Sequence, residues 1–206
     1  MWVNIAVALL AGYLLGNLNG AVITSKLMHD DVRNHGSGNA GLTNFIRNFG
    51  TGRAMMVIII DAGKALLSCL IGALLMNVYD MWLEGAVFGG LAVMLGHAFP
   101  VLLGFRGGKG ILSGLFVTIF IDWRIAILIM AVFAIAYFTT RYVSLGSVLA
   151  SFSYAAGFVV FHHDNLVVML CGIFMGLLAV FLHRENIVRL IKGKERKTDL
   201  FKKNKE

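Results

Sequence analysis

The chain has 206 residues, of which 58% are hydrophobic and only 14% are charged, with a formal net charge of +7 at pH 7. Soluble domains carry about a quarter charged residues, so this composition excludes an ordinary soluble fold and indicates an integral membrane protein. The two cysteines, Cys69 and Cys171, lie in apolar runs without metal-ligand spacing, so neither a disulfide nor a metal site is expected.

Six apolar segments are suited to crossing a bilayer, for which about 20 helical residues are needed. They cover residues 2–25, 54–78, 85–103, 125–140, 144–161 and 165–182. Residues 111–121 form a shorter apolar segment. Joining it to residues 125–138 would bury Asp122 and Arg124 in the membrane, at about 2.5–3.5 kcal/mol for each charge.

The positive charges favour a separate crossing by residues 111–121. Seven spans with the N-terminus outside place all the Lys and Arg residues inside except Lys64, which lies in a span, and Arg124. Because positive residues favour the cytoplasmic side, we predict an all-α membrane fold of about seven transmembrane helices with a cytoplasmic C-terminus. Residues 1–190 are interpreted as a single integral membrane domain, and residues 191–206 as a solvated, partly disordered polybasic tail.

The first polar stretch, "GSGNAGLTNFIR" at residues 36–47, is interpreted as a phosphate-binding loop. Its glycines allow successive backbone N–H groups to form an anion nest, its polar side chains add donors, and its arginine is a forked cation suited to phosphate. The expected binding groups are Gly36, Ser37, Gly38, Asn39, Gly41, Thr43, Asn44 and Arg47. The alternative is a flexible loop that caps the next helix.

Two further polar stretches fall on the same predicted face of the membrane. In "GHAFPVLLGFRGGKG" (96–110), Arg106 and Lys109 precede an apolar segment whose helix N-terminus would favour anions. It is not a Walker A loop, because Gly110 follows the lysine. In "HRENIVRL" (183–190), His183 and Asn186 share one helical face. Taken alone, each of these stretches is better interpreted as a membrane anchor, positively charged in the first case and polar in the second.

Inside the second apolar segment, Asp61 and Lys64 stand three residues apart and are predicted to form a neutralising pair. The sequence lacks the G-x-S-x-G elbow, the H-E-x-x-H zinc motif and the His-x4-Asp acyltransferase pattern. Any chemistry is therefore expected to come mainly from positioning and charge.

Together with "RYVSLGS" (141–147), these stretches resemble, in order and spacing, the bacterial PlsY-type acyl-phosphate:glycerol-3-phosphate acyltransferases. The resemblance implies a seven-helix protein of the plasma membrane with its active site facing the cytoplasm. It implies transfer of a fatty acyl group from acyl phosphate to the 1-hydroxyl of glycerol 3-phosphate, giving lysophosphatidic acid and phosphate. An acyl-phosphate-forming enzyme would supply the donor, and no cofactor, metal or nucleic acid is implied.

The resemblance also implies roles for individual residues. The active-site residues would be Ser37, Arg47, Lys109, His183 and Asn186. The glycerol 3-phosphate loop would contain Gly104, Arg106, Gly107, Gly108, Lys109 and Gly110, and Ser144 matches a serine of the family's fourth stretch. Asp61 and Lys64 would be structural, and Glu185 would hold the third motif together. The family is thought to use a substrate phosphate as its base, which we prefer over His97 or His183.

Departures from the family pattern are Asn17, Asn19, Ala40, Leu42 and Ala65, none of which removes a charged side chain. A carrier or channel for phosphate esters is the main alternative function. It would be expected to show inverted repeats around a midplane site, and no internal repeat is evident. An acyltransferase with a thioester donor and a structural membrane subunit are further alternatives, although the latter leaves the glycine loops unexplained.

Overall fold

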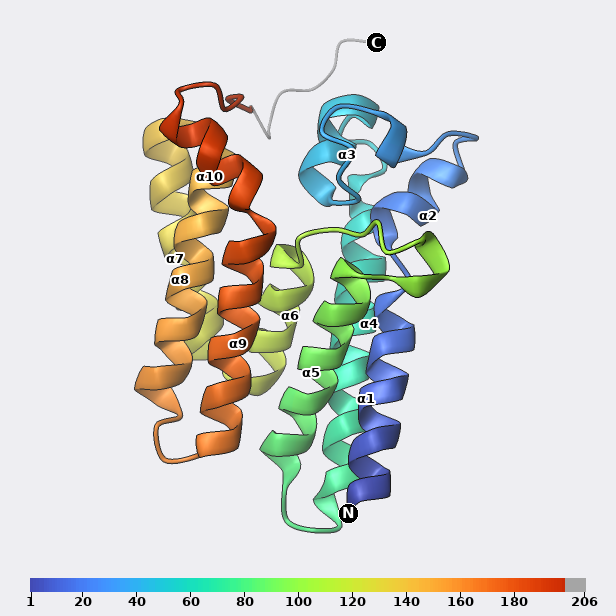
Figure 1. Cartoon of the computed structure of the whole chain (residues 1–206), viewed down its shortest axis with the longest axis vertical. Coiled ribbons are helices and arrows are strands. Elements are labelled where there is room, and N and C mark those ends of the chain that lie inside the picture. Colours follow the sequence, from blue (N-terminus) through green and yellow to red (C-terminus); the bar gives the residue numbers. More distant parts are fainter. Residues whose placement is uncertain (199–206) are drawn as a thin grey trace.

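Long apolar helices run between the two ends of the molecule in the computed structural model, which describes residues 1–198 (Figure 1). The α-helices are α1 (Trp2–Gly16), α2 (Gly20–Lys26), α3 (Leu42–Phe49), α4 (Ala54–Asn77), α5 (Trp82–Ala98), α6 (Ile111–Ile121), α7 (Trp123–Thr140), α8 (Val143–Phe161), α9 (Leu166–Leu182) and α10 (Arg184–Ile191). Short 3-10 helices cover Val32–Asn34 and Val101–Leu103. Figure 1 places the N-terminus at the end opposite α3 and α10.

The predicted all-α membrane fold is confirmed. Within residues 1–198, five helical segments are long and apolar enough to cross a membrane, and α9 with α10 makes a sixth if their 53° bend is included. Helix α6 is apolar but has only 11 residues. Seven crossings, and the sides on which the chain ends lie, therefore stay predictions.

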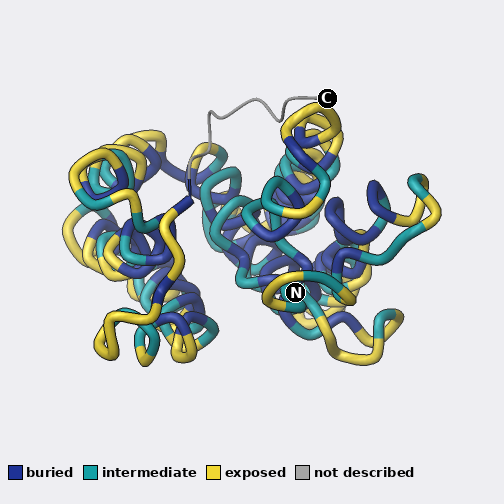
Figure 2. The backbone as a smooth tube through the Cα atoms, turned by 90° about the horizontal axis from the view of Figure 1, so that it is seen from above, coloured by how far each residue is buried: buried dark blue, intermediate teal, exposed yellow. Residues whose placement is uncertain are grey.

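Helix packing divides the chain into two groups, visible from above in Figure 2. Helices α1, α4 and α5 pack together with α6 beside them, while α7, α8 and α9 form the second group. Helices α4 and α5 approach so closely that a Cβ on Gly72 would lie 2.0 Å from the Gly85 carbonyl oxygen. Small residues permit this contact between membrane helices, where association depends on van der Waals packing. Apolar side chains such as Leu10, Ile59 and Phe174 stay exposed, as a lipid-facing surface requires.

The first apolar segment is broken rather than continuous, which the sequence did not predict. Helix α1 ends at Gly16, and the side chain of Asn19 accepts a hydrogen bond from the Val22 N–H to begin α2. The backbone carbonyls of Gly16 and Leu18, freed by the break, face the Lys64 ammonium at 3.4 and 2.8 Å. Broken helices within a membrane need such partners because no water is available there.

Residues 111–121 form a helix of their own, as predicted. The backbone is extended at Asp122, whose carboxylate caps α7 by accepting from the Arg124 N–H at 2.9 Å. Its second oxygen lies 2.6 Å from Arg124 Nη2 and 3.2 Å from His162 Nε2. The charged pair therefore sits at a helix junction, which avoids the cost of burying it in the middle of a span.

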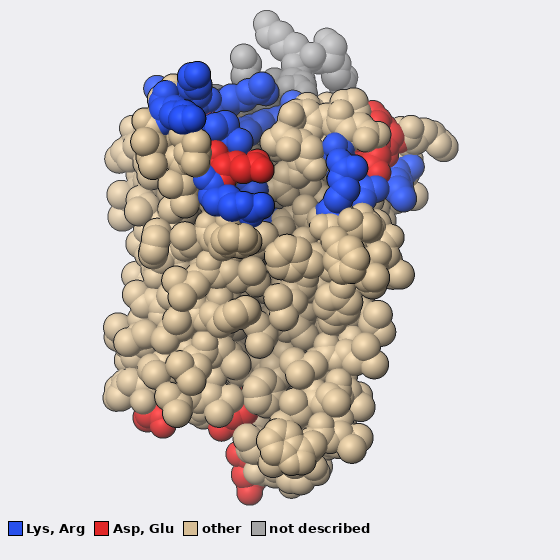
Figure 3. All heavy atoms as spheres, in the orientation of Figure 1, with Lys and Arg blue, Asp and Glu red and all other residues tan. Residues whose placement is uncertain are grey.

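The charges of the molecule are distributed unevenly along its long axis. Figure 3 shows Lys and Arg gathered at the end that carries α3 and α10, whereas acidic side chains alone mark the opposite end on this face. The polar stretches at residues 36–47, 104–110 and 183–190 all lie at the basic end (Figure 1). The fold thus brings the three predicted motifs together.

Candidate active site

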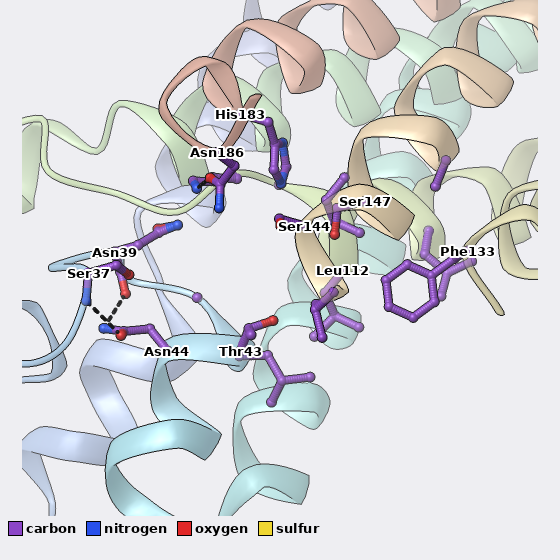
Figure 4. A pocket seen from close by; sticks show the side chains of 18 of the residues that line it. Ser37, Asn39, Thr43, Asn44, Leu112, Phe133, Ser144, Ser147, His183 and Asn186 are labelled. Carbon is purple, nitrogen blue, oxygen red and sulfur yellow. Dashed lines mark hydrogen bonds between the residues drawn. The ribbon is translucent and has the colours of Figure 1, made fainter. Parts of the chain in front are cut away.

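A cavity of about 480 Å³ lies at the basic end, between the two helix groups. This volume is typical of small-molecule sites. Its polar lining consists of Ser37, Asn39, Thr43, Asn44, Arg47, Asp61, His97, Lys109, Ser144, Ser147, His183, Asn186 and Arg189. Its apolar lining consists of Leu42, Ile46, Ile111, Leu112, Leu115, Ile129, Met130, Phe133, Val143 and Ala150. Figure 4 shows labelled side chains from the first and third motifs and from α6, α7 and α8 around this one space.

A second cavity, of about 460 Å³, adjoins the first and has a different character. It is lined by Gly36, Ser37, Asn44, Ile46, Arg47, Asn48, Arg189, Glu195, Arg196, Lys197 and Thr198. The two cavities share Ser37, Asn44, Ile46, Arg47 and Arg189. A largely apolar space within the helices and a polar space at the basic end therefore meet at one wall.

Asn44 gives the first motif its shape. Its Nδ2 donates to the carbonyl oxygens of Val32, His35 and Asn39 at 3.0–3.1 Å, and its Oδ1 accepts from the Ser37 N–H at 3.1 Å. The bonds to Ser37 and Asn39 are drawn in Figure 4. Asn44 lines the cavity, but its amide hydrogens point at the protein. It holds the loop rather than offering free donors to phosphate.

Most of the backbone N–H groups that were expected to form an anion nest donate hydrogen bonds to the protein itself. The N–H groups of Ser37, Gly38, Ala40 and Gly41 all donate to protein oxygens. Gly36 and Gly38 have φ angles of +60° and +68°, which favour glycine and turn the chain. These four N–H groups therefore do not form an open nest in this structure, and phosphate binding by the loop stays a prediction. What remains for a ligand is the first turn of α3, with Arg47 one turn beyond it.

The second motif places Lys109 and the start of α6 against the cavity. A Cβ on Gly107 would lie 2.0 Å from the His97 carbonyl oxygen, and one on Gly108 would lie 2.2 Å from His97 Nε2. Glycine is thus required by close approach at both positions. Gly110, with a φ of +77°, directs the chain into α6. Gly104 and Arg106 are exposed and line neither cavity, so the structure does not bring them to the predicted phosphate site.

The two predicted cations, Arg47 and Lys109, both line the cavity. Lys109 Nζ donates to the Asn186 side-chain oxygen. Burial lowers the pKa of Lys109 to about 8, and the nearby positive charge of Arg189 acts in the same direction. Burial likewise lowers the pKa of the Arg47 guanidinium. Both cations are partly stripped of water, which strengthens their interaction with an anion.

The third motif begins at the bend between α9 and α10, where His183 and Asn186 are both buried. His183 Nδ1 lies 2.8 Å from the Ala179 carbonyl oxygen and donates to it. Figure 4 shows both side chains directed toward the cavity. Ser144 on α8 lines the same space, and its buried hydroxyl has no hydrogen-bond partner among residues 1–198.

Two glutamates, Glu185 and Glu195, contact the third motif, and the structural role expected of Glu185 stays a prediction. The Glu185 side chain is 74% exposed and lies 3.8 Å from Arg189. The Glu195 carboxylate is buried, accepts from Arg189 Nε at 2.9 Å and lies 3.3 Å from Asn186 Nδ2. Sequence reasoning missed Glu195 because it assigned that residue to a solvated tail.

The start of the tail also differs from that expectation. Thr198 is buried, and its Oγ1 accepts from Arg47 Nε at 2.7 Å and from Arg47 Nη2. Its backbone N–H donates to the Arg141 carbonyl oxygen at 3.1 Å, and its own carbonyl oxygen accepts from Tyr137 Oη at 3.2 Å. Residues up to Thr198 thus tie α3 to the end of α7. The rest of the predicted polybasic tail, residues 199–206, lies outside the described residues.

The predicted pair of Asp61 and Lys64 is present, with 2.7 Å between carboxylate and ammonium. Both are buried, and Asp61 also lines the cavity. His97 completes the cluster, with its Nδ1 2.8 Å from Lys64 Nζ. The spacing of Asp61 and Lys64 revealed the pair, whereas no local signal connected it to His97.

The sequence model of the family described as "Glycerol-3-phosphate acyltransferase" matches residues 6–193. The chain belongs to this family. A glycerol-3-phosphate acyltransferase of Finegoldia magna is 37% identical over 186 residues, which cover 90% of this chain and 91% of the relative. The corresponding protein of Shouchella clausii is 37% identical over 203 residues, covering 96% and 97%.

Solved structures of PlsY, described as an integral membrane glycerol 3-phosphate acyltransferase, have the same fold. Its glycerol 3-phosphate form has a TM-score of 0.83 and 32% identity, covering 96% of this chain and 99% of that one. Its lysophosphatidic acid form has a TM-score of 0.81 and 30% identity, covering 95% and 96%. The predicted PlsY-type family is confirmed, and the chain is a multi-pass membrane acyltransferase that acts on glycerol 3-phosphate.

Proposed function

We propose that this acyltransferase moves a fatty acyl group from acyl phosphate to the 1-hydroxyl of glycerol 3-phosphate, giving lysophosphatidic acid and inorganic phosphate. The observation that carries the proposal is the shared wall of the two cavities, at Ser37, Asn44, Ile46, Arg47 and Arg189. An amphiphilic donor in the largely apolar cavity and a soluble acceptor in the polar cavity would meet there.

The charges at this wall suit two anionic substrates. Arg47 and Arg189 lie on the wall and Lys109 lines the first cavity, while Glu195 in the second cavity offsets only part of their charge. Arginine and lysine bind phosphate oxygens through charge-assisted hydrogen bonds. Ser37, Ser144 and Asn186 add neutral groups, and the start of α6 adds helix N–H groups behind Lys109.

The reaction needs little covalent help from the protein. The acceptor hydroxyl oxygen attacks the acyl carbonyl carbon, the bond from that carbon to the phosphate oxygen breaks, and inorganic phosphate leaves. The hydroxyl proton passes to a substrate phosphate oxygen. Holding both substrates in line supplies up to about 7–11 kcal/mol of the barrier reduction, and Arg47 and Lys109 stabilise the departing phosphate.

The donor's acyl chain would follow the apolar lining. Leu112 and Leu115 on α6, Ile129 and Phe133 on α7, and Ala150 on α8 supply that surface. The phosphate end would then stay beside Lys109. We further propose that the basic end faces the cytoplasm of a bacterial cell, that α6 is a short seventh crossing, and that an acyl-phosphate-forming enzyme supplies the donor.

Product analysis with purified protein in lipid mesophase tests the proposal. Palmitoyl phosphate with glycerol 3-phosphate should give lysophosphatidic acid and phosphate in equal amounts, and palmitoyl-CoA should give neither. Lys109→Ala should lose activity at least 100-fold, since it removes a desolvated cation from the reacting phosphate. Lys192→Ala, an exposed lysine at the end of α10, is the matched control and should stay within twofold.

Product formed only from palmitoyl-CoA would contradict the proposed donor while leaving the acyltransferase class intact. Formation of the 2-acyl isomer would contradict the proposed acceptor position. If no donor gave product, uptake of radiolabelled glycerol 3-phosphate into liposomes would test the remaining alternative, a phosphate-ester carrier that uses the same basic end.

A further inference from the structure

Three buried ionisable side chains from two spans form a cluster, two of whose members, Asp61 and His97, line the cavity. Asp61 and Lys64 come from α4, and His97 comes from the last turn of α5. Each is at most 4% exposed. Asp61 Oδ1 accepts from Lys64 at 2.7 Å and from the Gly20 N–H at 3.1 Å, so the carboxylate also holds the start of α2.

The contacts of Lys64 determine which nitrogen of His97 carries the proton. An ammonium has three N–H donors and accepts nothing. Lys64 Nζ has three acceptors within 2.8 Å, namely Asp61 Oδ1, the Leu18 carbonyl oxygen and His97 Nδ1. His97 Nδ1 must therefore present its lone pair to Lys64. A proton there would point at a cation, and Asp61 Oδ1, at 3.8 Å, is too far away to accept it. The imidazole proton is thus placed on Nε2.

The Nε2 side of the ring faces the point where the first two motifs cross. A Cβ on Gly108 would lie 2.2 Å from Nε2 and 2.7 Å from the Ala40 carbonyl oxygen. The two loops are joined there, because the Ala40 N–H donates to the Gly107 carbonyl oxygen at 3.4 Å. His97 lines the cavity, and no hydrogen bond from its Nε2 is made to any residue between 1 and 198.

We propose that His97 donates a hydrogen bond from Nε2 to a negatively charged substrate oxygen, and that Asp61 and Lys64 are positioning residues that hold it in this tautomer. The proposal rests on the proposed function, because it assigns a further binding group to the same site. The Nε2 N–H opens onto the cavity without a partner among residues 1–198, so it is available to a ligand oxygen there. Asp61 and Lys64 then not only neutralise each other but also orient His97 toward the substrate.

The second histidine of the cavity is held in the opposite way. His183 donates from Nδ1 to the Ala179 carbonyl oxygen, so its neutral ring presents the lone pair of Nε2. His97 therefore offers the cavity a neutral donor, and His183 offers it a neutral acceptor. Because its Nε2 already carries a proton, His97 is not suited to removing one from the acceptor hydroxyl. Its role is to bind a negatively charged oxygen of the substrate.

Two variants of His97 separate this task from a structural one. Asn places its side-chain oxygen near the Nδ1 position, so His97→Asn keeps an acceptor for Lys64 but ends short of Nε2. Gln places an amide donor near the Nε2 position, so His97→Gln keeps the donor to the substrate. Size-exclusion profiles and thermal unfolding in detergent establish that each variant is folded.

In the assay with palmitoyl phosphate, we expect His97→Gln to keep at least a tenth of the wild-type kcat/KM. We expect His97→Asn to lose 100-fold or more, as when one preorganised donor is removed from an oxyanion site. The reverse order would show that His97 matters only as a partner of Lys64 and would overturn the proposal. Equal large losses would assign His97 as a base, and no loss in either variant would exclude any contact with substrate.

Nitrogen NMR of the wild-type protein tests the same inference without catalysis or mutation. With ¹⁵N-labelled histidine, and with His97→Gln used to assign the signal, the His97 ring should show a protonated Nε2 and an unprotonated Nδ1. Titration with glycerol 3-phosphate or with palmitoyl phosphate should move the Nε2 resonance in at least one case. A proton on Nδ1, or no movement with either ligand, would overturn the proposal.

The NMR outcome is distinct from failure of the proposed function. A wild-type protein that made no lysophosphatidic acid from acyl phosphate would refute that donor. The His97 resonance would still respond, or fail to respond, to glycerol 3-phosphate, which the family acylates.

Discussion

On one side of the cavity, the loop at residues 36–41 is held by Asn44, whose hydrogen bonds reach no further than twelve residues along the chain. Elsewhere around the cavity, the start of α10 and Arg47 are held by Glu195 and Thr198. Thr198 stands 151 residues from Arg47 in the sequence. Apart from the bonds of Ala40 to Asn19 and Gly107, the first wall is thus built locally, whereas the second exists only when the chain end returns to the site.

The two parts of the site should therefore respond differently to mutation. Loss of the local wall removes several buried hydrogen bonds at once and should affect folding and activity together. Loss of a contact from the returning chain end should leave the helices intact and alter the site alone. Four experiments test this distinction, in order of expected effect.

Asn44→Asp should have the largest effect. It keeps the shape of the side chain but turns a carboxylate toward the carbonyl oxygens of Val32, His35 and Asn39. Removing the donors from buried acceptors costs about 1–3 kcal/mol per group. We expect acylation to fall more than 100-fold and the thermal unfolding midpoint to fall with it. Asn34→Asp, at an exposed position in the same segment, should change neither. A stable but inactive Asn44→Asp protein would assign Asn44 to substrate instead.

Glu195→Gln should have the next largest effect. The charge-assisted hydrogen bond from Arg189 is weakened and Asn186 loses its carboxylate partner, which together correspond to about 1.5–3 kcal/mol. Steady-state kinetics should show kcat reduced about tenfold to a hundredfold without a comparable loss of thermal stability. Glu185→Gln is the matched control and should stay within twofold. Equal losses in the two variants would return the structural role to Glu185.

The third experiment uses pH to test Lys109. Burial lowers its pKa to about 8, so the free enzyme carries this positive charge below that pH and loses it above. We therefore expect kcat/KM for glycerol 3-phosphate to be level below about pH 8 and to fall as the pH rises further. In Lys109→Arg the side chain keeps its charge at high pH, so kcat/KM should begin to fall at a higher pH than in the wild type. The maximal kcat/KM of the variant should be lower, because arginine differs from lysine in shape. An unchanged profile in the variant would mean that another group titrates.

Thr198→Val should have the smallest effect. It keeps the volume of the side chain but removes the oxygen that accepts from Arg47. Initial rates should show KM for glycerol 3-phosphate raised two- to fivefold, because the guanidinium is less well positioned, with kcat nearly unchanged. Thr198→Ser keeps the hydroxyl and should behave as wild type. A lower KM in Thr198→Val would show that Thr198 competes with substrate for Arg47.

The positions of the helices could be predicted from the sequence more accurately than the hydrogen-bond partners of their polar side chains. Apolar runs located all the candidate spans, and the cost of burying Asp122 and Arg124 separated α6 from α7. The break between α1 and α2 escaped notice because Asn17 and Asn19 were judged only as departures from a family pattern. Their side chains supply the caps that a broken membrane helix needs, a role that depends on neighbouring helices.

What the sequence by itself determined is the set of local properties: apolar length, charge bunched at one end, and glycine where the chain must turn or approach closely. These follow from residue chemistry and spacing alone. Only the tertiary structure decided that most N–H groups of the first loop are used internally, that Glu195 rather than Glu185 supports Asn186, and that Lys64 reaches His97. The contact of Lys64 with His97 spans 33 residues, so its geometry is set by helix packing. The contacts of Ser37 with Asn44 and of Asn186 with Glu195 span only 7 and 9 residues, but they lie in irregular segments and leave no periodic signal in the sequence.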